Sequence, residues 1–196
     1  MSATYSASGA PAATAQDTRW RTRDIVVAAI IGVAFGVVFV AWNGVWSLTQ
    51  PLVPPVHNLI YGVWLVPAVL APLIVRKPGA ALFSEMVAAG LSVVLGSQWG
   101  PDALLSGFVQ GAAAELVFAF GLYRSYSLPV VLIAALASAA AAWIHDWALY
   151  YTLVDTPTQL AVGLAMAISA VVITAGGSIA LERALRQSGV LEGFPT

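Results

Sequence analysis

The chain has 196 residues, of which 60% are hydrophobic and only 9% are charged, with a formal net charge of −1 and no cysteine. A water-soluble domain normally carries about a quarter charged residues, so this composition indicates an integral membrane protein. The missing cysteines exclude disulfides, thiolate metal sites and cysteine nucleophiles. The eight basic residues provide no surface for nucleic acid.

Small and polar residues fill positions 1–18, and this composition predicts a disordered N-terminal tail. The tail lacks the basic start and the apolar stretch of a signal peptide. We expect one transmembrane domain over residues 19–187 and a short C-terminal tail over residues 188–196.

Six apolar segments follow the N-terminal tail, each near the ~20 residues that a helix needs to cross a bilayer. We expect these membrane helices at 24–43, 58–75, 80–97, 104–123, 128–151 and 160–182. Pro78 and Gly79 predict a tight turn, and the proline-rich segment 47–57 predicts an irregular connection that is a candidate lid. The predicted fold is an all-α integral membrane protein with six transmembrane helices.

The basic residues all fall on one side of the membrane if the chain crosses it six times. They are Arg19, Arg21, Arg23, Arg76, Lys77, Arg124, Arg183 and Arg186, and the three opposite connections contain none. The positive-inside rule then places both termini in the cytoplasm. Five or seven crossings would scatter these charges over both sides, so the charge pattern supports six.

Acidic residues inside the expected helices are the first candidates for function. Glu115 shares one face of segment 104–123 with Gly107 and Gly111, at a spacing of four residues that predicts a close neighbouring helix. A carboxylate in hydrocarbon costs about 3 kcal/mol on insertion scales, so it is a functional-site hypothesis by default. No Lys or Arg lies within the spans. Glu85 and Glu115 must therefore be protonated, hydrogen-bonded or neutralised by a ligand.

Aromatic and polar side chains gather in the outer halves of the expected helices, away from the basic side. Aromatic walls with a few aimed polar groups describe a pocket for a small, flat molecule, which can be a cation. Beside Glu85 and Glu115, the candidate binding residues are Trp42, Asn43, Trp46, Tyr61, Trp64, Gln98, Trp99, Gln110, His145, Asp146 and Tyr150. For any single tryptophan, an interfacial aromatic belt is the commoner explanation. The adjacent His145 and Asp146 point to different helix faces, so no dyad is expected.

A ridge of small residues, Ala28, Gly32 and Gly36, follows one face of the first expected helix. Such ridges permit close helix contact, either inside the bundle or with a separate membrane protein. Taken alone, the pattern favours packing inside the bundle, because this spacing is common.

Catalytic motifs do not occur: the chain has no Gly-x-Ser-x-Gly, no His-Glu-x-x-His and no glycine-rich loop that ends in Lys-Ser/Thr. We expect neither an enzyme nor a cofactor, and two histidines argue against a metal centre. One hypothesis of another class is a stand-alone secondary transporter of a small aromatic or cationic solute, coupled to protons or ions through Glu85 and Glu115.

Four stretches resemble a known family: RTRDIVVAAIIGVAFGVVF, IVRKPGAALFSEMVAA, GSQWG and VQGAAAELVFAFGLYR. They resemble the YkoE family, the substrate-binding S components of energy-coupling-factor (ECF) transporters associated with thiamine or its hydroxymethylpyrimidine precursor. The likeness runs from Arg19 to Arg186, and RKPGAALFSE and QGAAAEL are its specific parts.

The resemblance implies a six-helix S-component fold with both termini inside and a set of partners. These are a transmembrane T component and two cytoplasmic ATPase units, or a fused pair of them, which hydrolyse ATP. It also favours docking on the T component as the role of Ala28, Gly32 and Gly36.

The implied ligand suits the candidate residues. A 4-aminopyrimidine presents an amino donor and ring-nitrogen acceptors to a carboxylate and to amides such as Gln110, and a thiazolium cation suits tryptophan and tyrosine faces. These features favour thiamine over its precursor, with Glu115 as the main ligand-facing residue. On an ideal helix, however, Gln110 and Glu115 lie about 140° apart.

Overall fold

Six membrane-crossing units form the fold, and every regular element among the described residues, 18–194, is helical. In this computed structural model, five units are long and apolar enough to span a bilayer: Thr22–Thr49, Pro54–Val75, Asp102–Phe120, Leu128–Leu149 and Thr156–Gln187. The sixth, Ala80–Val94, is apolar but shorter. The expected number and order of helices are therefore confirmed, while the predicted N-terminal tail lies almost wholly outside the described residues.

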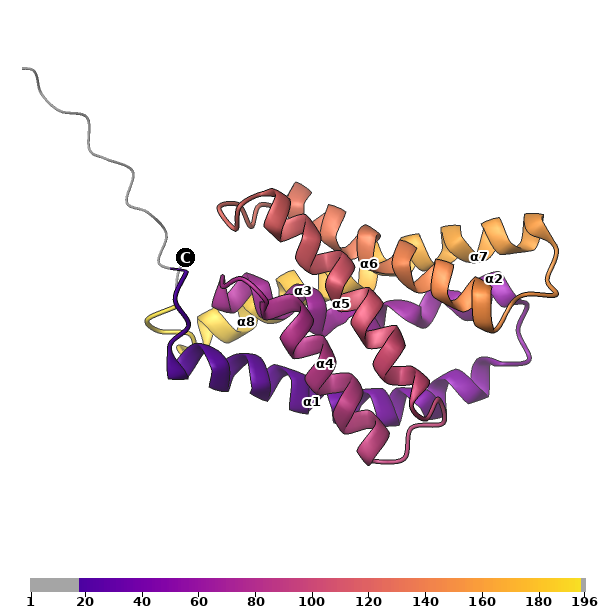
Figure 1. The fold of residues 1–196 in the computed structure, drawn as a ribbon, viewed down its shortest axis with the longest axis horizontal. Coiled ribbons are helices and arrows are strands. Elements are labelled where there is room, and N and C mark those ends of the chain that lie inside the picture. The colour runs from indigo at the N-terminus through magenta and orange to yellow at the C-terminus, as the bar shows by residue number, and fades with distance from the viewer. Residues whose placement is uncertain (1–17, 195–196) are drawn as a thin grey trace, which may run out of the picture.

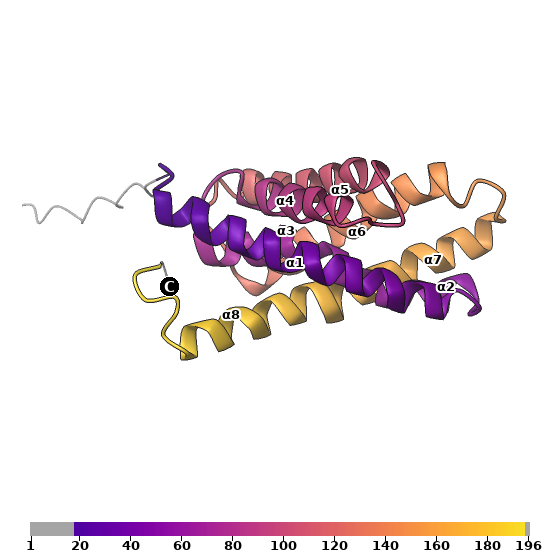
Figure 2. The ribbon, with the colours of Figure 1, turned by 90° about the horizontal axis from the view of Figure 1, so that it is seen from below.

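Within residues 18–194, these six units consist of ten helical elements, and Figure 1 shows their path through the bundle. In chain order they are α1 (Thr22–Thr49), α2 (Pro54–His57), the 3₁₀-helix η1 (Asn58–Leu65), α3 (Val66–Val75), α4 (Ala80–Val94), α5 (Asp102–Phe120), α6 (Leu128–Leu149), α7 (Thr156–Ser169), the π-helix η2 (Ala170–Gly176) and α8 (Gly177–Gln187). The second unit thus joins α2, η1 and α3, and the last joins α7, η2 and α8. Figure 2 shows α7 and α8 nearly in line along the bundle.

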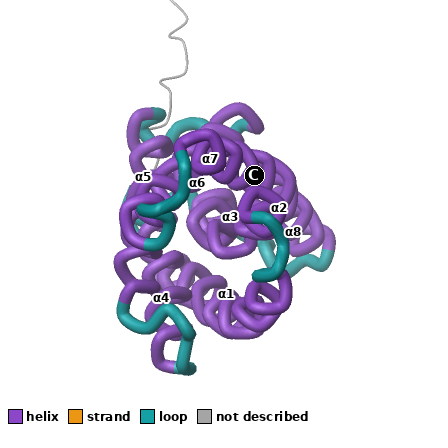
Figure 3. Tube along the Cα trace, turned by 90° about the vertical axis from the view of Figure 1, so that its right-hand side faces the viewer, coloured by secondary structure: helices purple, strands orange, loops and turns teal. Residues whose placement is uncertain are grey.

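Helix α3 is the centre of the bundle, and the other helices surround it in the end-on view (Figure 3). Its sequence, VPAVLAPLIV, is apolar on every side, and all ten of its residues are buried. A helix that is hydrophobic all round is expected to be buried in this way. Pro72 lies inside the helix, and the helix ends at Arg76, which adopts a left-handed conformation with φ of 52°.

The two described ends of the chain meet at one end of the bundle (Figure 1). The Arg23 guanidinium lies 4.9 Å from the centre of the Phe194 ring, and Leu191 is buried against the first helix. Trp20 Nε1 donates a hydrogen bond of 2.9 Å to the carbonyl oxygen of Pro78, in the turn before α4. We call this the basic end, because the connections that carry Lys77 and the arginines lie here.

The ridge of Ala28, Gly32 and Gly36 packs inside the bundle, against α4. A Cβ added to Gly32 would lie 2.6 Å from Val87 Cβ, and one added to Gly36 would lie 2.8 Å from Leu91 Cβ. The docking role that the family resemblance favoured is therefore wrong for this face, because α4 already covers it. The pattern-based interpretation, packing inside the bundle, is the one that the structure supports.

The glycines of α5 also serve close packing, as their spacing predicted. A Cβ added to Gly107 would lie 2.7 Å from Ala89 Cβ, and one added to Gly111 would lie 3.0 Å from Glu85 Cβ. Helices α4 and α5 therefore approach each other closely at the depth of Glu85. This close approach limits the space that is open to the Glu85 side chain.

A candidate ligand-binding cavity

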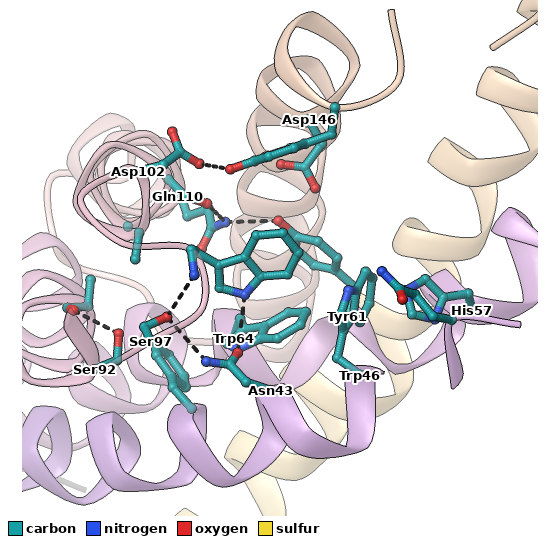
Figure 4. Close-up of a pocket in the computed structure, with 18 of the residues that line it drawn as sticks. Asn43, Trp46, His57, Tyr61, Trp64, Ser92, Ser97, Asp102, Gln110 and Asp146 are labelled. Atoms are coloured by element: carbon teal, nitrogen blue, oxygen red, sulfur yellow. Dashed lines mark hydrogen bonds between the residues drawn. The ribbon is translucent and has the colours of Figure 1, made fainter. Parts of the chain in front are cut away.

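A cavity of about 310 Å³ lies toward the end of the bundle opposite the basic end (Figure 4). Its walls come from the second half of α1, the lid segment, η1, α4, the first half of α5 and the end of α6. Nine of the predicted binding residues line it: Asn43, Trp46, Tyr61, Trp64, Glu85, Trp99, Gln110, Asp146 and Tyr150. Gln50, Leu52 and Pro54 add the lid segment to the lining.

Trp46 organises the aromatic wall. Its ring centre lies 4.8 Å from that of Trp64, 5.9 Å from Tyr61 and 6.3 Å from Trp99, all in edge-to-face arrangements. Tyr61 and Trp64 are three residues apart on η1, and a 3₁₀-helix brings residues at this spacing to the same side. The local helix type thus places both rings in one wall.

Amide side chains fix the aromatic rings in place (Figure 4). Trp99 Nε1 donates to Asn43 Oδ1 at 3.1 Å, and Asn43 Nδ2 donates to Ser97 Oγ at 3.2 Å. Gln110 Nε2 donates to the Tyr61 hydroxyl at 3.2 Å. Such bonds restrict the rotamers of Trp99 and Tyr61, so the wall is formed before any ligand enters.

Glu85 lies at the inner limit of the cavity and is fully buried. Its Oε2 accepts a hydrogen bond of 3.0 Å from the backbone N–H of Ala68, while Oε1 has no hydrogen-bond partner among the described residues. The absence of side chains at Gly107 and Gly111 leaves room for Glu85 between α4 and α5. An unpaired carboxylate oxygen beside a cavity is a ready acceptor for a donor on a ligand.

At the mouth of the cavity, side chains from the start of α5 and the end of α6 contact one another. His145 Nδ1 lies 2.8 Å from Asp146 Oδ1, and His145 Nε2 lies 3.2 Å from Asp102 Oδ1. The Tyr150 hydroxyl donates a hydrogen bond to Asp102. Burial is the main cause of the raised pKa of Tyr150, and this hydrogen bond raises it further. The expectation that His145 and Asp146 form no pair is therefore wrong, because the two nitrogens of the imidazole contact the Asp146 and Asp102 carboxylates.

Glu115 does not line the cavity, which corrects the leading prediction from sequence. Its Oε1 accepts hydrogen bonds from the Gly79 backbone N–H at 2.6 Å and from the Tyr123 hydroxyl at 2.8 Å, and its Oε2 accepts from the Ala81 N–H at 2.9 Å. These N–H groups belong to the start of α4, where the helix dipole favours a negative charge. The carboxylate is at the basic end of the bundle and acts as a cap for α4. Of the two predicted residues on α5, Gln110 lines the cavity and Glu115 does not.

Three further predicted residues also lie outside the lining. Trp42 Nε1 donates to the Ile60 carbonyl oxygen at 3.0 Å and so supports η1 from behind. Gln98 Oε1 accepts from the Ser47 hydroxyl at 3.1 Å on the exposed surface. His145 contacts the lining carboxylates without forming part of the lining.

Sequence reasoning missed several lining residues, of which Asp102 is the most important. Asp102 lies in the first turn of α5, and an acid in that position is commonly explained by the helix dipole alone. The other lining residues that were missed include His57, Ser92, Ser97, Ser106 and Tyr151. His57 packs on Trp46 with ring centres 3.6 Å apart, and no sequence spacing signals this contact.

Comparisons with known proteins agree with one another on the class of protein. Residues 23–141 match the family described as ABC-type cobalt transport system, permease component. YkoE, a candidate HMP/thiamine permease protein of Bacillus subtilis (strain 168), is 33% identical to this chain in an alignment of 178 residues, and the alignment covers 89% of each protein. A crystal structure of an S component of an ECF transporter superposes with a TM-score of 0.86 and 32% identity, over 89% of this chain and 90% of the other.

Proposed function

The chain belongs to the family of YkoE and the ECF-transporter S components, and from this premise we propose that its cavity binds thiamine or hydroxymethylpyrimidine. As an S component it is the substrate-binding membrane subunit of an importer, whose other subunits are a T component and ATPases. The name of the relative supports the choice of ligand.

The observation that carries the proposal is the buried carboxyl group of Glu85: this residue lines an aromatic cavity, and its Oε1 has no hydrogen-bond partner among the described residues. A 4-aminopyrimidine is a flat ring with an amino donor, and it fits a site built from ring faces and one carboxylate acceptor. Gln110, which is 3% exposed, adds an amide group to the same wall. We place the pyrimidine ring against Glu85 and Gln110, with Trp46, Trp64 and Trp99 around it.

Charge at the cavity supports thiamine over its uncharged precursor. Among the described lining residues, Glu85, Asp102 and Asp146 are acidic, and no lysine or arginine occurs. A thiazolium cation gains about 0.5–2 kcal/mol over a tryptophan or tyrosine face, depending on desolvation. The Asp102 and Asp146 carboxylates at the mouth lie where the thiazolium would rest if the pyrimidine enters first.

The orientation of the chain follows from the same proposal. The basic end faces the cytoplasm by the positive-inside rule, which puts both ends of the chain inside and the cavity mouth outside. In domain terms, residues 19–187 form the transmembrane unit. Residues 188–194 of the C-terminal tail fold back onto α1 through Leu191 and Phe194.

A titration of the purified chain in detergent with thiamine and with hydroxymethylpyrimidine tests the ligand proposal. We expect saturable quenching of tryptophan fluorescence, because three tryptophans line the cavity, with the tighter binding for thiamine. If neither compound binds, the ligand assignment is wrong.

No observation favours a proton relay through Glu85 and Glu115. The Glu115 carboxylate is held by backbone N–H groups at the start of α4, away from the cavity lining. Uptake of a solute by the chain alone in proteoliposomes under a proton gradient would support the hypothesis of a stand-alone transporter.

A further inference from the structure

Two buried hydroxyls hold the backbone of Gly62 from both sides. The Gly62 N–H donates to Ser169 Oγ at 2.8 Å, and the Thr174 hydroxyl donates to the Gly62 carbonyl oxygen at 2.7 Å. Ser169 is 1% exposed and Thr174 is fully buried. We call the arrangement of Gly62, Ser169 and Thr174 the Gly62 clasp.

The π-helix η2 makes the clasp possible. Ser169 is the last residue of α7, and Thr174 lies five positions later within η2. On an ideal α-helix, two residues at this spacing point about 140° apart and could not hold one glycine between them. A π-helix closes its turn between residues i and i+5, so it brings the two hydroxyls to one side. The irregular turn therefore presents both hydroxyls to η1.

The clasp requires glycine at position 62. A Cβ there would lie 2.6 Å from the Ser169 carbonyl oxygen and 2.9 Å from Thr174 Oγ1. Contacts below about 3 Å to backbone cannot be relieved by rotating a side chain, so any larger residue would push η1 away from α7.

Gly62 directly follows Tyr61 and precedes Trp64 by two residues, and both of these aromatic residues belong to the cavity wall. The hydrogen bonds within a 3₁₀-helix have poorer geometry than those of an α-helix, so the path of η1 depends on its outside partners. The Tyr61 hydroxyl lies 3.2 Å from Gln110 Nε2, and the ring centres of Trp64 and Trp46 are 4.8 Å apart. A change in the orientation of Gly62 would turn Tyr61 away from Gln110 and Trp64 away from Trp46.

We propose that Ser169 and Thr174 are positioning residues for the ligand: through Gly62 they set the orientation of Tyr61 and Trp64. Neither Ser169 nor Thr174 lines the cavity. The inference rests on the proposed function, since the orientation of the wall matters for affinity only if the cavity holds a ligand. It extends the functional site from the cavity to the middle of the sixth membrane crossing.

Four variants of the full chain test the proposal: Thr174→Val, Ser169→Ala, Thr174→Ser and Ser178→Ala. Thr174→Val keeps the shape and removes the hydroxyl, while Thr174→Ser keeps the hydroxyl. Ser178→Ala is the matched control, because Ser178 is fully buried in the same crossing and its hydroxyl has no hydrogen-bond partner among the described residues.

The readouts are the near-ultraviolet circular dichroism of the empty protein and the dissociation constants for thiamine and for hydroxymethylpyrimidine. We expect Thr174→Val and Ser169→Ala to change the tryptophan and tyrosine dichroism and to weaken binding by about fivefold to tenfold, as for a lost buried hydrogen bond. Thr174→Ser should restore both readouts, and Ser178→Ala should leave both unchanged.

Unchanged dichroism and unchanged affinity in Thr174→Val and Ser169→Ala would overturn the proposal. So would a loss that Thr174→Ser does not restore, because that result would assign the effect to packing. If Thr174→Val does not fold, Ser169→Ala is judged by the same criteria. If the unaltered chain binds neither compound, the proposed ligand is wrong, whereas the dichroism of the empty protein still decides the role of the clasp.

Discussion

The carboxylate of Glu115 on α5 accepts a hydrogen bond of 2.6 Å from the backbone N–H of Gly79, directly before α4. Gly79 has a positive φ of 87°, so the chain turns sharply here and exposes the first N–H groups of α4 to the carboxylate. The Tyr123 hydroxyl, 2.8 Å from the same oxygen, adds the connection to α6. One acid thus ties together two connections at the basic end.

Replacing Glu115 with Gln should destabilise the protein without weakening ligand binding. The variant loses a charged acceptor shared by backbone N–H groups, which corresponds to about 2 kcal/mol. Denaturant unfolding in mixed micelles measures the loss, and titration with thiamine measures the affinity. Glu182→Gln is the control: it removes the negative charge from the ion pair between Glu182 and Arg186 at i, i+4, and such a pair is worth about 0.5 kcal/mol. A large loss of affinity in Glu115→Gln would return this residue to the binding site.

The same substitution at Glu85 should have the opposite outcome. In Glu85→Gln, the amide oxygen can keep the bond to the Ala68 N–H, so the amide NH₂ would take the place of the unpaired oxygen. A donor would then meet the amino donor of the pyrimidine, and we expect about 100-fold weaker binding with little change in stability. Isothermal titration of both glutamine variants side by side gives the measurement. Equal affinity in the Glu85→Gln variant and the unaltered chain would remove Glu85 from the site.

Alkaline pH should destabilise the protein through Tyr123. Burial raises the pKa of Tyr123 to about 12, and the Glu115 hydrogen bond and charge add to the shift. Because the folded pKa exceeds the unfolded value of about 10, this stabilisation is fully present below pH 10 and is lost as the pH rises through 12. Unfolding midpoints across that interval measure the slope. Tyr123→Phe should flatten it, and an unchanged slope in that variant would assign it to other tyrosines.

Replacing glycines of α1 by alanine should lower the free energy of unfolding where the glycine packs on α4 and should not lower it where the glycine is exposed. Gly32→Ala forces a Cβ to within 2.6 Å of Val87, so we expect a loss of about 1–3 kcal/mol. Gly44→Ala is the matched control on the same helix, because a Cβ there meets nothing within 4 Å. It should be neutral or stabilise the helix by about 0.5–1 kcal/mol. Equal unfolding free energies for the two variants would contradict the packing of Gly32 on α4.

Hydropathy and charge were enough to predict the class of fold. Six apolar stretches and the one-sided placement of Arg76, Lys77 and Arg124 predicted six crossings, because the cost of burying charge in hydrocarbon acts on each stretch independently of its neighbours. The helix ends differed by a few residues, since α1 and the last crossing extend beyond their apolar cores into Thr49 and Gln187. The glycine spacing on α5 also predicted its close contact with α4 correctly.

The lining of the candidate site could be predicted only in part. Most of the aromatic lining was found, because tryptophans and tyrosines near the outer helix ends share one membrane depth. The two glutamates could not be ranked from sequence, since Glu85 and Glu115 each lie in an apolar helix among small residues. The difference is what each carboxylate meets. Glu115 meets the free N–H groups of a neighbouring helix, and Glu85 meets one N–H and a cavity.

The sequence by itself therefore determined that the chain crosses the membrane six times and which end carries the basic residues, because both follow from the local cost of transferring side chains into the bilayer. Only the tertiary structure decided which carboxylate faces the cavity, which face of α1 is covered, and that Ser169 and Thr174 hold Gly62. These contacts join residues far apart in the chain. Their geometry depends on how neighbouring helices pack, and on a π-helix that the local sequence does not reveal.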